Sequence, residues 1–219
     1  MDYIILPVKI LKESKKRLSN ILEADERNEL AFTMFLDVVE TIVKMKNKVK
    51  LIIITQDKRV NEVAVSLGIQ VLSEKEAKGQ SEAVNLGTDK CIEMNIRSVL
   101  TLPADIPLLK TDDLEEIFVN SQNVDVVIVP SRDRNGTNAL FRRPPNVMKV
   151  EFGDDSYRKH IKTVKSLKIK HVVLDIERLA LDIDNVHDLE ELLNQNECNT
   201  HTNDFLRKIK IHDRIRKQV

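Results

Sequence analysis

The chain is poor in residues on which several classes of protein depend. It has five glycines, two cysteines and no tryptophan in 219 residues. Cys91 and Cys198 lie far apart without metal-ligand spacing, which argues against a disulfide framework and against a cysteine-based zinc site. Because only two tyrosines and no tryptophan are present, few aromatic platforms exist for stacking bases. We expect a protein of a reducing compartment that does not bind single-stranded nucleic acid.

Positive and negative side chains are equal in number. Lys plus Arg total 35 and Asp plus Glu total 35, so no net field attracts a polyanion or an acidic membrane. The first apolar run is interrupted by Pro7 and Lys9 and has no basic segment before it, which is unlike a signal peptide or a membrane span. We expect a cytoplasmic protein that binds neither nucleic acid nor membranes. A homodimer is left open.

Short apolar runs and helical stretches alternate along the chain. The apolar runs have strand length and no polar alternation, and they cover residues 3–8, 49–55, 98–103, 124–130 and 170–174. The stretches with helical periodicity cover residues 25–45, 57–67, 81–94, 111–120, 154–165 and 186–193. This alternation predicts an α/β fold with a mostly parallel sheet, helices on both faces, and ligands beyond the carboxyl ends of the strands.

The composition changes near residue 194. No linker or repeat precedes this point, so residues 1–194 are predicted to form one domain. Residues 195–219 are polar and then basic, with one narrow apolar stripe. We expect a loosely docked terminal helix there; a partner-binding segment is the alternative.

A basic segment follows the first predicted strand. Lys9, Lys15 and Arg17 lie within nine residues and could gather a polyphosphate. No glycine occurs between Tyr3 and Arg17, which excludes a P-loop and a dinucleotide fingerprint. Side chains would therefore hold any phosphate here; a solvated basic loop is the alternative.

Aspartates follow two further apolar segments. Asp105 comes directly after the predicted strand 98–103. In an extended segment, Asp182 and Asp184 would share one face about 6.5–7 Å apart. Such carboxylates suit magnesium, which takes a few protein oxygens together with substrate phosphates. Asp184 could alternatively be the N-cap of the next helix.

Two polar segments near the middle of the chain predict an anion site. They read RNGTNAL at residues 134–140 and FGDDSYRKH at residues 152–160. Gly153 and Ser156 stand where a helix should begin, and the free amides there would favour a small phosphorylated acid. His160 is four residues after Ser156, on the same helix face. In the alternative interpretation Ser156 or Asp154 caps the helix and His160 only packs.

These segments occur in an order that resembles a known family. PVKxxxxxKxRL at 7–18, PADIPLL at 103–109, NGTNAL at 135–140, FGxxSxxxH at 152–160 and LDID at 181–184 resemble the CofC family of phospholactate guanylyltransferases. The resemblance implies a single-domain, GT-A-like nucleotidyltransferase fold. It also implies a reaction of GTP with 2-phospho-L-lactate, phosphoenolpyruvate or phosphoglycerate that releases pyrophosphate and serves coenzyme F-420 synthesis.

The resemblance also implies roles for individual residues. The magnesium ligands would be Asp105, Asp182 and Asp184. The acceptor phosphate would lie at Thr137, Gly153 and Ser156. The GTP phosphates would lie at Lys9, Lys15 and Arg17, which with Asp105 form the predicted catalytic set. The partners would be GTP and a small phosphorylated carboxylic acid.

One segment departs from the family pattern. Where many members have Leu-Asn-x-Ala near the nucleotide base, this chain reads QSEA at residues 80–83, which puts Ser81 in the predicted nucleotide site. This difference weakens the case for guanine. Another GT-A-like nucleotidyltransferase is one alternative, although it should have a glycine-rich first loop. A non-catalytic nucleotide-binding module is another, although it should not need all three aspartates.

Overall fold

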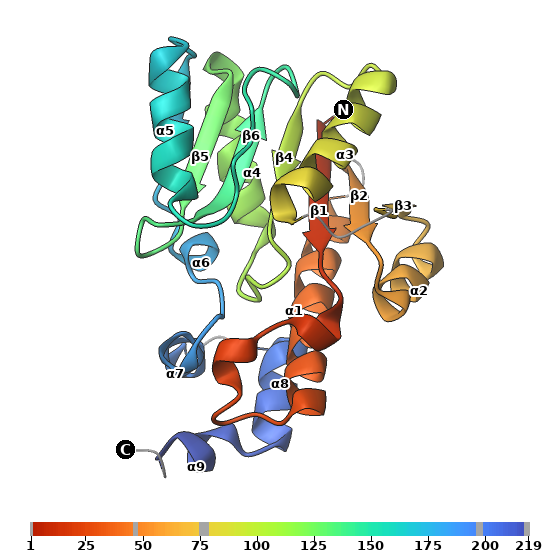
Figure 1. The fold of residues 1–219 in the computed structure, drawn as a ribbon, viewed down its shortest axis with the longest axis vertical. Helices are drawn as coiled ribbons and strands as arrows, with labels where there is room; N and C mark the ends of the chain where they lie inside the picture. The colour runs from red at the N-terminus through yellow and green to blue at the C-terminus, as the bar shows by residue number, and fades with distance from the viewer. Residues whose placement is uncertain (1, 46–47, 75–78, 196–198, 217–219) are drawn as a thin grey trace.

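A computed structural model describes residues 2–45, 48–74, 79–195 and 199–216 (Figure 1). Its strands form one sheet in the order β3-β2-β1-β4-β6-β5-β7. The strands are β1 (Asp2–Val8), β2 (Val49–Thr55), β3 (Gln70–Leu72), β4 (Val99–Thr101), β5 (Val126–Pro130), β6 (Thr137–Arg142) and β7 (His171–Val173). Only β6 runs antiparallel to its neighbours, β4 and β5. The predicted mostly parallel α/β sheet is thus confirmed.

The helices lie between and after these strands. The α-helices are α1 (Ala24–Lys44), α2 (Lys58–Ser66), α3 (Gln80–Glu93), α4 (Thr111–Asn120), α5 (Ser156–Ser166), α6 (Glu177–Ala180), α7 (Val186–Asn194), α8 (His201–Lys208) and α9 (Ile211–Arg216). Short 3-10 turns are η1 (Leu11–Glu13), η2 (Lys16–Leu18) and η3 (Ser121–Asn123). Within the described residues, none of these helices has the length and apolarity that crossing a membrane requires.

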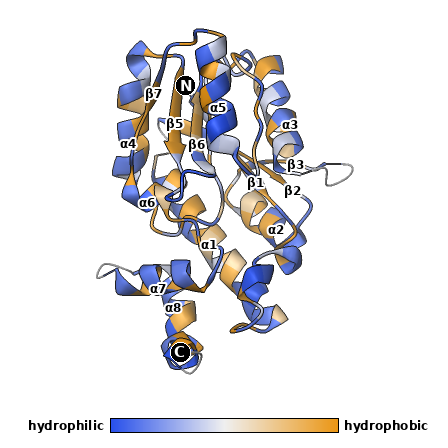
Figure 2. Cartoon of the chain, turned by 60° about the vertical axis from the view of Figure 1, so that its left-hand side comes forward, coloured by the Kyte–Doolittle hydropathy of each residue, from blue (hydrophilic) through white to orange (hydrophobic). Residues whose placement is uncertain are grey.

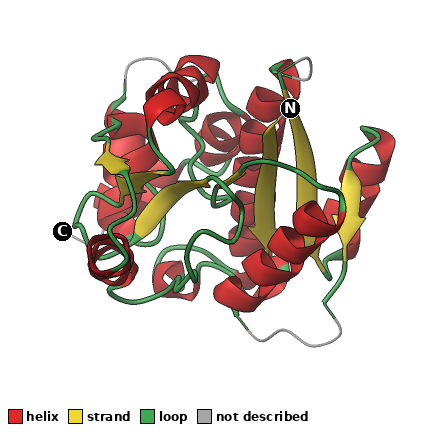
Figure 3. Cartoon of the chain, turned by 90° about the horizontal axis from the view of Figure 1, so that it is seen from above, coloured by secondary structure: helices red, strands yellow, loops and turns green. Residues whose placement is uncertain are grey.

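Alternate side chains of the strands enter different hydrophobic clusters. Ile4 and Leu6 of β1 pack with α1, α2 and α4, whereas Tyr3 and Ile5 pack with α3. The other end of this second face packs β5 and β6 against α5. The central strands are mostly apolar because helices cover both faces of the sheet (Figures 2 and 3).

Two strands were not expected from the pattern. β3 has three residues and lies at the edge of the sheet, too short for a periodic signal. β6 contains the last four residues of the NGTNAL segment, 137–140, and pairs with β5 in an antiparallel hairpin with an irregular register at Pro130. Because β6 is antiparallel, its first residues stand at the same edge as the last residues of β5. This reversal brings Thr137 to the edge where the carboxyl ends of β1 and β4 also lie.

The C-terminal segment differs from the expected loosely docked helix. It forms two helices, and α8 packs beside α1 (Figure 1). Leu206 and Ile211 are fully buried. The Asp37 carboxylate of α1 accepts hydrogen bonds from the backbone amide and the hydroxyl of Thr202 at 3.0 and 2.6 Å. Buried side chains and the hydrogen bonds to Asp37 therefore hold this segment against α1, although its composition is polar and basic.

Candidate active site

A cleft of about 970 Å³ lies at the carboxyl edge of the sheet. Its walls come from the segments after β1, β4 and β5, from the start of β6, from the start of α5, and from the link between α6 and α7. Among its lining residues are Lys9, Lys15, Arg17, Asp105, Thr137, Gly153, Ser156, Asp182 and Asp184. The fold thus brings together every predicted site residue except Ser81.

Lys15 joins two of the aspartates. Its ammonium lies 2.6 Å from Asp105 Oδ2 and 2.8 Å from Asp184 Oδ1, and its side chain is 6% exposed. Its backbone is left-handed, at φ 55° and ψ 35°, just before η2. Burial alone would lower the pKa of Lys15, but the two carboxylates outweigh burial and raise it. Lys15 is therefore a charged counter-ion inside the site and is not part of a solvated loop.

Asp182 belongs to the same group but has a different partner. Its Oδ1 accepts a hydrogen bond of 2.9 Å from the Asn138 side chain, which also donates to the Leu179 carbonyl. Burial raises the pKa of Asp182 to about 6, and the charges of Asp105 and Asp184 contribute to the rise. The three carboxylates thus share one electrostatic environment in which negative charge exceeds what Lys15 compensates.

The backbone around Asp184 explains this convergence. Leu181 and Ile183 point into the core, so the aspartates between and after them face the cleft. The Ile183 amide donates to the Asp105 carbonyl at 3.1 Å, which ties the two segments together. The interpretation of Asp184 as a helix cap is wrong, because Asn185 is the N-cap of α7.

This donor set fits a magnesium ion that is completed by substrate. No three acidic, histidine or cysteine side chains in the described part of the chain are gathered closely enough to hold a metal by themselves. Asp105 and Asp184 instead share the Lys15 ammonium. Magnesium usually takes one or two carboxylates, several waters and phosphate oxygens. Surplus carboxylate charge beside an open cleft matches that requirement.

Arg17 and Lys9 behave differently from Lys15. The Arg17 side chain is 74% exposed, and its nearest carboxylate oxygen, Asp184 Oδ2, is 3.9 Å away. Lys9 is also exposed and lines the same cleft. Two solvated cations therefore stand at the mouth of the cleft, with their heads available to an entering anion.

The start of α5 forms another part of the cleft lining. Ser156 begins the helix as expected, but its amide donates to the Gly153 carbonyl at 3.1 Å. The amides of Asp155 and Tyr157 donate to the side chain and carbonyl of Asn135. The prediction that the Ser156 amide is free for an anion is therefore wrong, because the turn and the 131–136 loop use these donors.

Side chains on this wall still offer donors. The Ser156 residue is 1% exposed, lines the cleft, and its hydroxyl has no hydrogen-bond partner within the described residues. Gly153 has φ +109°, and a Cβ built there would meet nothing within 4 Å. Thr137 also lines the cleft, and its hydroxyl lies 3.0 Å from His160 Nδ1. His160 is thus both buried and hydrogen-bonded.

Ser81 is the one predicted site residue that faces elsewhere. Its hydroxyl accepts a hydrogen bond of 2.8 Å from the Phe152 amide. Its neighbours Gly79, Gln80 and Ala83 line the cleft in its place. Ser81 therefore supports the 152–153 loop and does not line the cleft.

Two cleft residues were missed from the sequence. Asn138 follows Thr137 in the NGTNAL segment and holds Asp182, which its position in that motif could have indicated. The departure from the family pattern at residues 80–83 indicated Ser81, but its neighbour Gln80 is the residue that lines the cleft.

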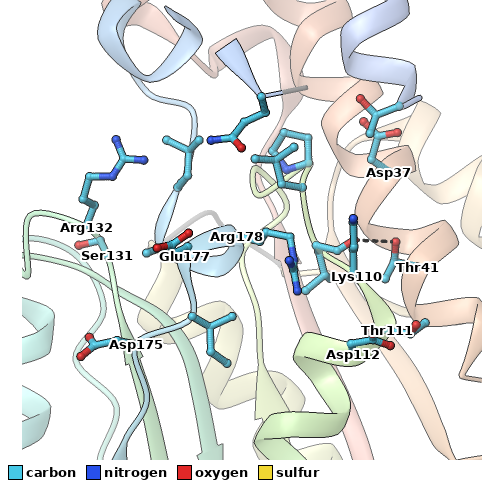
Figure 4. A pocket seen from close by; sticks show the side chains of 18 of the residues that line it. Asp37, Thr41, Lys110, Thr111, Asp112, Ser131, Arg132, Asp175, Glu177 and Arg178 are labelled. Carbon is cyan, nitrogen blue, oxygen red and sulfur yellow. Dashed lines mark hydrogen bonds between the residues drawn. The ribbon is translucent and has the colours of Figure 1, made fainter. Parts of the chain in front are cut away.

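A second cleft has a volume of about 1260 Å³ (Figure 4). It shares Ser131, Arg132, Ala180 and Leu181 with the first. Several of its polar groups already have partners. Arg178 forms two hydrogen bonds with Asp113, at 2.6 and 2.9 Å, and Thr41 donates to the Leu109 carbonyl. These contacts connect α6 to α4, and α1 to the segment before α4.

Known proteins resemble this chain in both sequence and structure. A 2-phospho-L-lactate guanylyltransferase from Methanobrevibacter smithii is 33% identical over 210 residues, covering 96% of this chain and 91% of the relative. A phosphoenolpyruvate guanylyltransferase from Conexibacter woesei is 32% identical over 192 residues, covering 87% of this chain and 86% of the relative.

Solved structures share the fold at lower identity. A protein from Desulfovibrio desulfuricans G20, described as a nucleotide-diphospho-sugar transferase, has a TM-score of 0.79 at 19% identity and covers 99% of this chain and 97% of its own. A nucleotidyl transferase from Methanothermobacter thermautotrophicus has a TM-score of 0.65 at 12% identity and covers 95% and 99%. The single-domain nucleotidyltransferase fold expected from the motifs is confirmed.

A family model described as "Guanylyl transferase CofC like" matches residues 2–218, which include the C-terminal helices as well as the cleft. The match therefore extends beyond LDID at residues 181–184, the last of the motifs that carry the resemblance. The chain belongs to the family of CofC-like guanylyl transferases.

Proposed function

We propose that this chain transfers a guanylyl group from GTP to a small phosphorylated carboxylic acid, with magnesium and with release of pyrophosphate. The acceptor would be 2-phospho-L-lactate, phosphoenolpyruvate or phosphoglycerate, and the product would serve coenzyme F-420 synthesis. The observation that supports this proposal most directly is that one cleft contains two sets of groups. The first set is Asp105, Asp182 and Asp184 with Lys15, and the second is Thr137 and Ser156, which carry hydroxyls.

The chemistry needs no activated nucleophile. A phosphomonoester is already anionic near neutral pH, so one of its oxygens can attack the α phosphorus of GTP without a general base. The new bond joins the two phosphates, and the bond from the α phosphorus to the bridging oxygen breaks as pyrophosphate leaves. Lys9 and Arg17 would bind the triphosphate at the cleft mouth, and Lys15 would keep the carboxylates in place. Magnesium bound by these carboxylates and by phosphates would neutralise charge on the reacting groups.

Pyrophosphate release tests the proposal. The purified chain is mixed with each of the four nucleoside triphosphates and each of the three acceptors, with magnesium or with a chelator. We expect turnover with GTP and one acceptor, and none with chelator. Higher turnover with CTP would identify a nucleotidyltransferase of another base. Absence of turnover with every pair would contradict the proposal.

A further inference from the structure

His160 is held rigidly behind the acceptor wall of the cleft. Its side chain in α5 is fully buried. The Phe152 ring packs edge-on against it, with ring centroids 5.2 Å apart and planes at 75°. Both ring nitrogens also have partners, so the orientation of the imidazole is determined by three contacts.

The partners of the two nitrogens determine where the proton lies. The Glu151 amide lies 3.0 Å from Nε2, and a backbone amide can only donate, so Nε2 must be the unprotonated nitrogen. Burial, together with the charges of Arg142 and Lys159, lowers the pKa of His160 to about 4, so the ring is neutral near pH 7. Its one proton is therefore on Nδ1, which donates to Thr137 Oγ1 at 3.0 Å.

This bond decides what Thr137 can offer to a ligand. A hydroxyl that accepts from Nδ1–H has its own proton free to donate elsewhere. Within the described residues no other side chain or backbone group accepts that proton, and Thr137 lines the cleft. The hydroxyl is thus fixed as a donor. An ionised phosphate or carboxylate has only acceptor atoms, which matches such a donor.

We propose that His160 is a positioning residue that fixes the Thr137 hydroxyl as a hydrogen-bond donor to the anionic group of the acceptor. The inference rests on the proposed function, because it assigns the acceptor to the wall that contains Thr137 and Ser156. His160 itself does not contact the substrate. Because Nδ1–H occupies the acceptor side of the hydroxyl, the hydroxyl proton cannot point at His160. It already points away from the ring before the anion binds.

Two amide variants separate the two hydrogen bonds of the ring. In His160→Asn the side-chain nitrogen stands as many bonds from the backbone as Nδ1, so it can still donate to Thr137. In His160→Gln the side-chain oxygen stands as many bonds away as Nε2, so it can still accept from the Glu151 amide. His171→Gln removes an imidazole from β7, away from the cleft, and serves as the control.

Steady-state kinetics with GTP and phosphoenolpyruvate or 2-phospho-L-lactate then tests the role. We expect His160→Gln to raise the acceptor KM roughly 3- to 10-fold, with the GTP KM unchanged, and His160→Asn to restore most of the acceptor affinity. In a Thr137→Val background, His160→Gln should have no further effect on the acceptor KM. Equal changes in both KM values, or additive effects of the two substitutions, would show that His160 only packs.

Nitrogen NMR of the wild-type chain provides a readout that needs neither turnover nor a variant. We expect a protonated Nδ1 and an unprotonated Nε2. The reverse tautomer would overturn the inference even in an active enzyme. Failure of the proposed function is distinguishable, because no acceptor would then react while the tautomer stayed as described.

Discussion

Lys15 and Asp184 are 169 residues apart in the chain, yet their side chains form an ion pair of 2.8 Å inside the cleft. The same ammonium also contacts Asp105 at 2.6 Å. Removing either carboxylate therefore leaves the buried Lys15 ammonium with one counter-charge instead of two. For this reason the site should be sensitive to substitution of either aspartate.

Asp184→Asn should lower turnover by about 10²- to 10³-fold, because it removes a carboxylate that would hold magnesium at the reacting phosphates. The fold should persist, since the carboxylate is 43% exposed and does not cap a helix. Pyrophosphate release and thermal unfolding measure the two effects. The matched control is Asp89→Asn, on the exposed face of α3. Wild-type turnover in the Asp184 variant would remove this residue from the site.

Arg17→Ala should weaken GTP binding roughly 10-fold or more and leave acceptor affinity nearly unchanged, because a guanidinium can bind two phosphate oxygens. Calorimetric titration with GTP measures the change. Lys16→Ala controls for loss of a nearby positive charge, since Lys16 is exposed and does not line the cleft. If both variants bind GTP as tightly as the wild-type chain does, Arg17 is only a solvated surface residue.

Gly153→Val should raise the acceptor KM far more than the GTP KM. A Cβ at this position meets no protein atom within 4 Å, so we expect the effect to come from strain at φ +109° and from crowding of the acceptor. Gly68→Val is the control, because Gly68 also has a positive φ and open space but does not line the cleft. Both variants should lose stability; an equal effect on both substrates would place the acceptor elsewhere.

The neutral His160 ring should make stability depend on pH. Its pKa of about 4 in the folded chain lies below the ordinary 6.5, so the unfolded chain binds a proton that the folded chain does not. Its contribution is fully present above about pH 6.5 and is lost as pH falls toward 4, by at most about 1.4 kcal/mol per pH unit. Urea unfolding at several pH values should show a flatter dependence in His160→Asn.

His201 should contribute to the pH dependence of stability in the opposite direction. Its hydrogen bond to Glu40 raises the pKa of His201, so its contribution is lost as pH rises. His201→Gln should therefore leave the acid-side loss of stability in place. If it removed that loss, the assignment to His160 would be wrong.

Leu206→Ala should destabilise the chain by about 2–5 kcal/mol, because this side chain of α8 is fully buried in the main hydrophobic cluster. Arg207→Ala, on the exposed side of α8, should change the free energy of unfolding by less than about 0.5 kcal/mol. Chemical denaturation compares the two. Equal, small effects would restore the view of a loosely docked tail.

The sequence by itself determined β1, β2, β4, β5 and β7 and the residues that follow them, but not β3 or β6. Buried strands are continuous apolar runs, and parallel strands end at one edge, so the segments after β1 and β4 had to meet. The alternation of an extended segment also determined that Asp182 and Asp184 face the cleft, with Ile183 between them in the core. These features depend on local periodicity, which a single sequence contains.

Only the tertiary structure decided which groups are partners. The sequence placed Lys15 among phosphate ligands, but packing puts its ammonium between Asp105 and Asp184. It placed Ser81 near the base and left the Ser156 amide free, yet Phe152 and Gly153 take these groups. A polar group bonds to whatever the fold brings within about 3 Å, and segments distant in the chain supply most of those partners, so no local pattern could specify them.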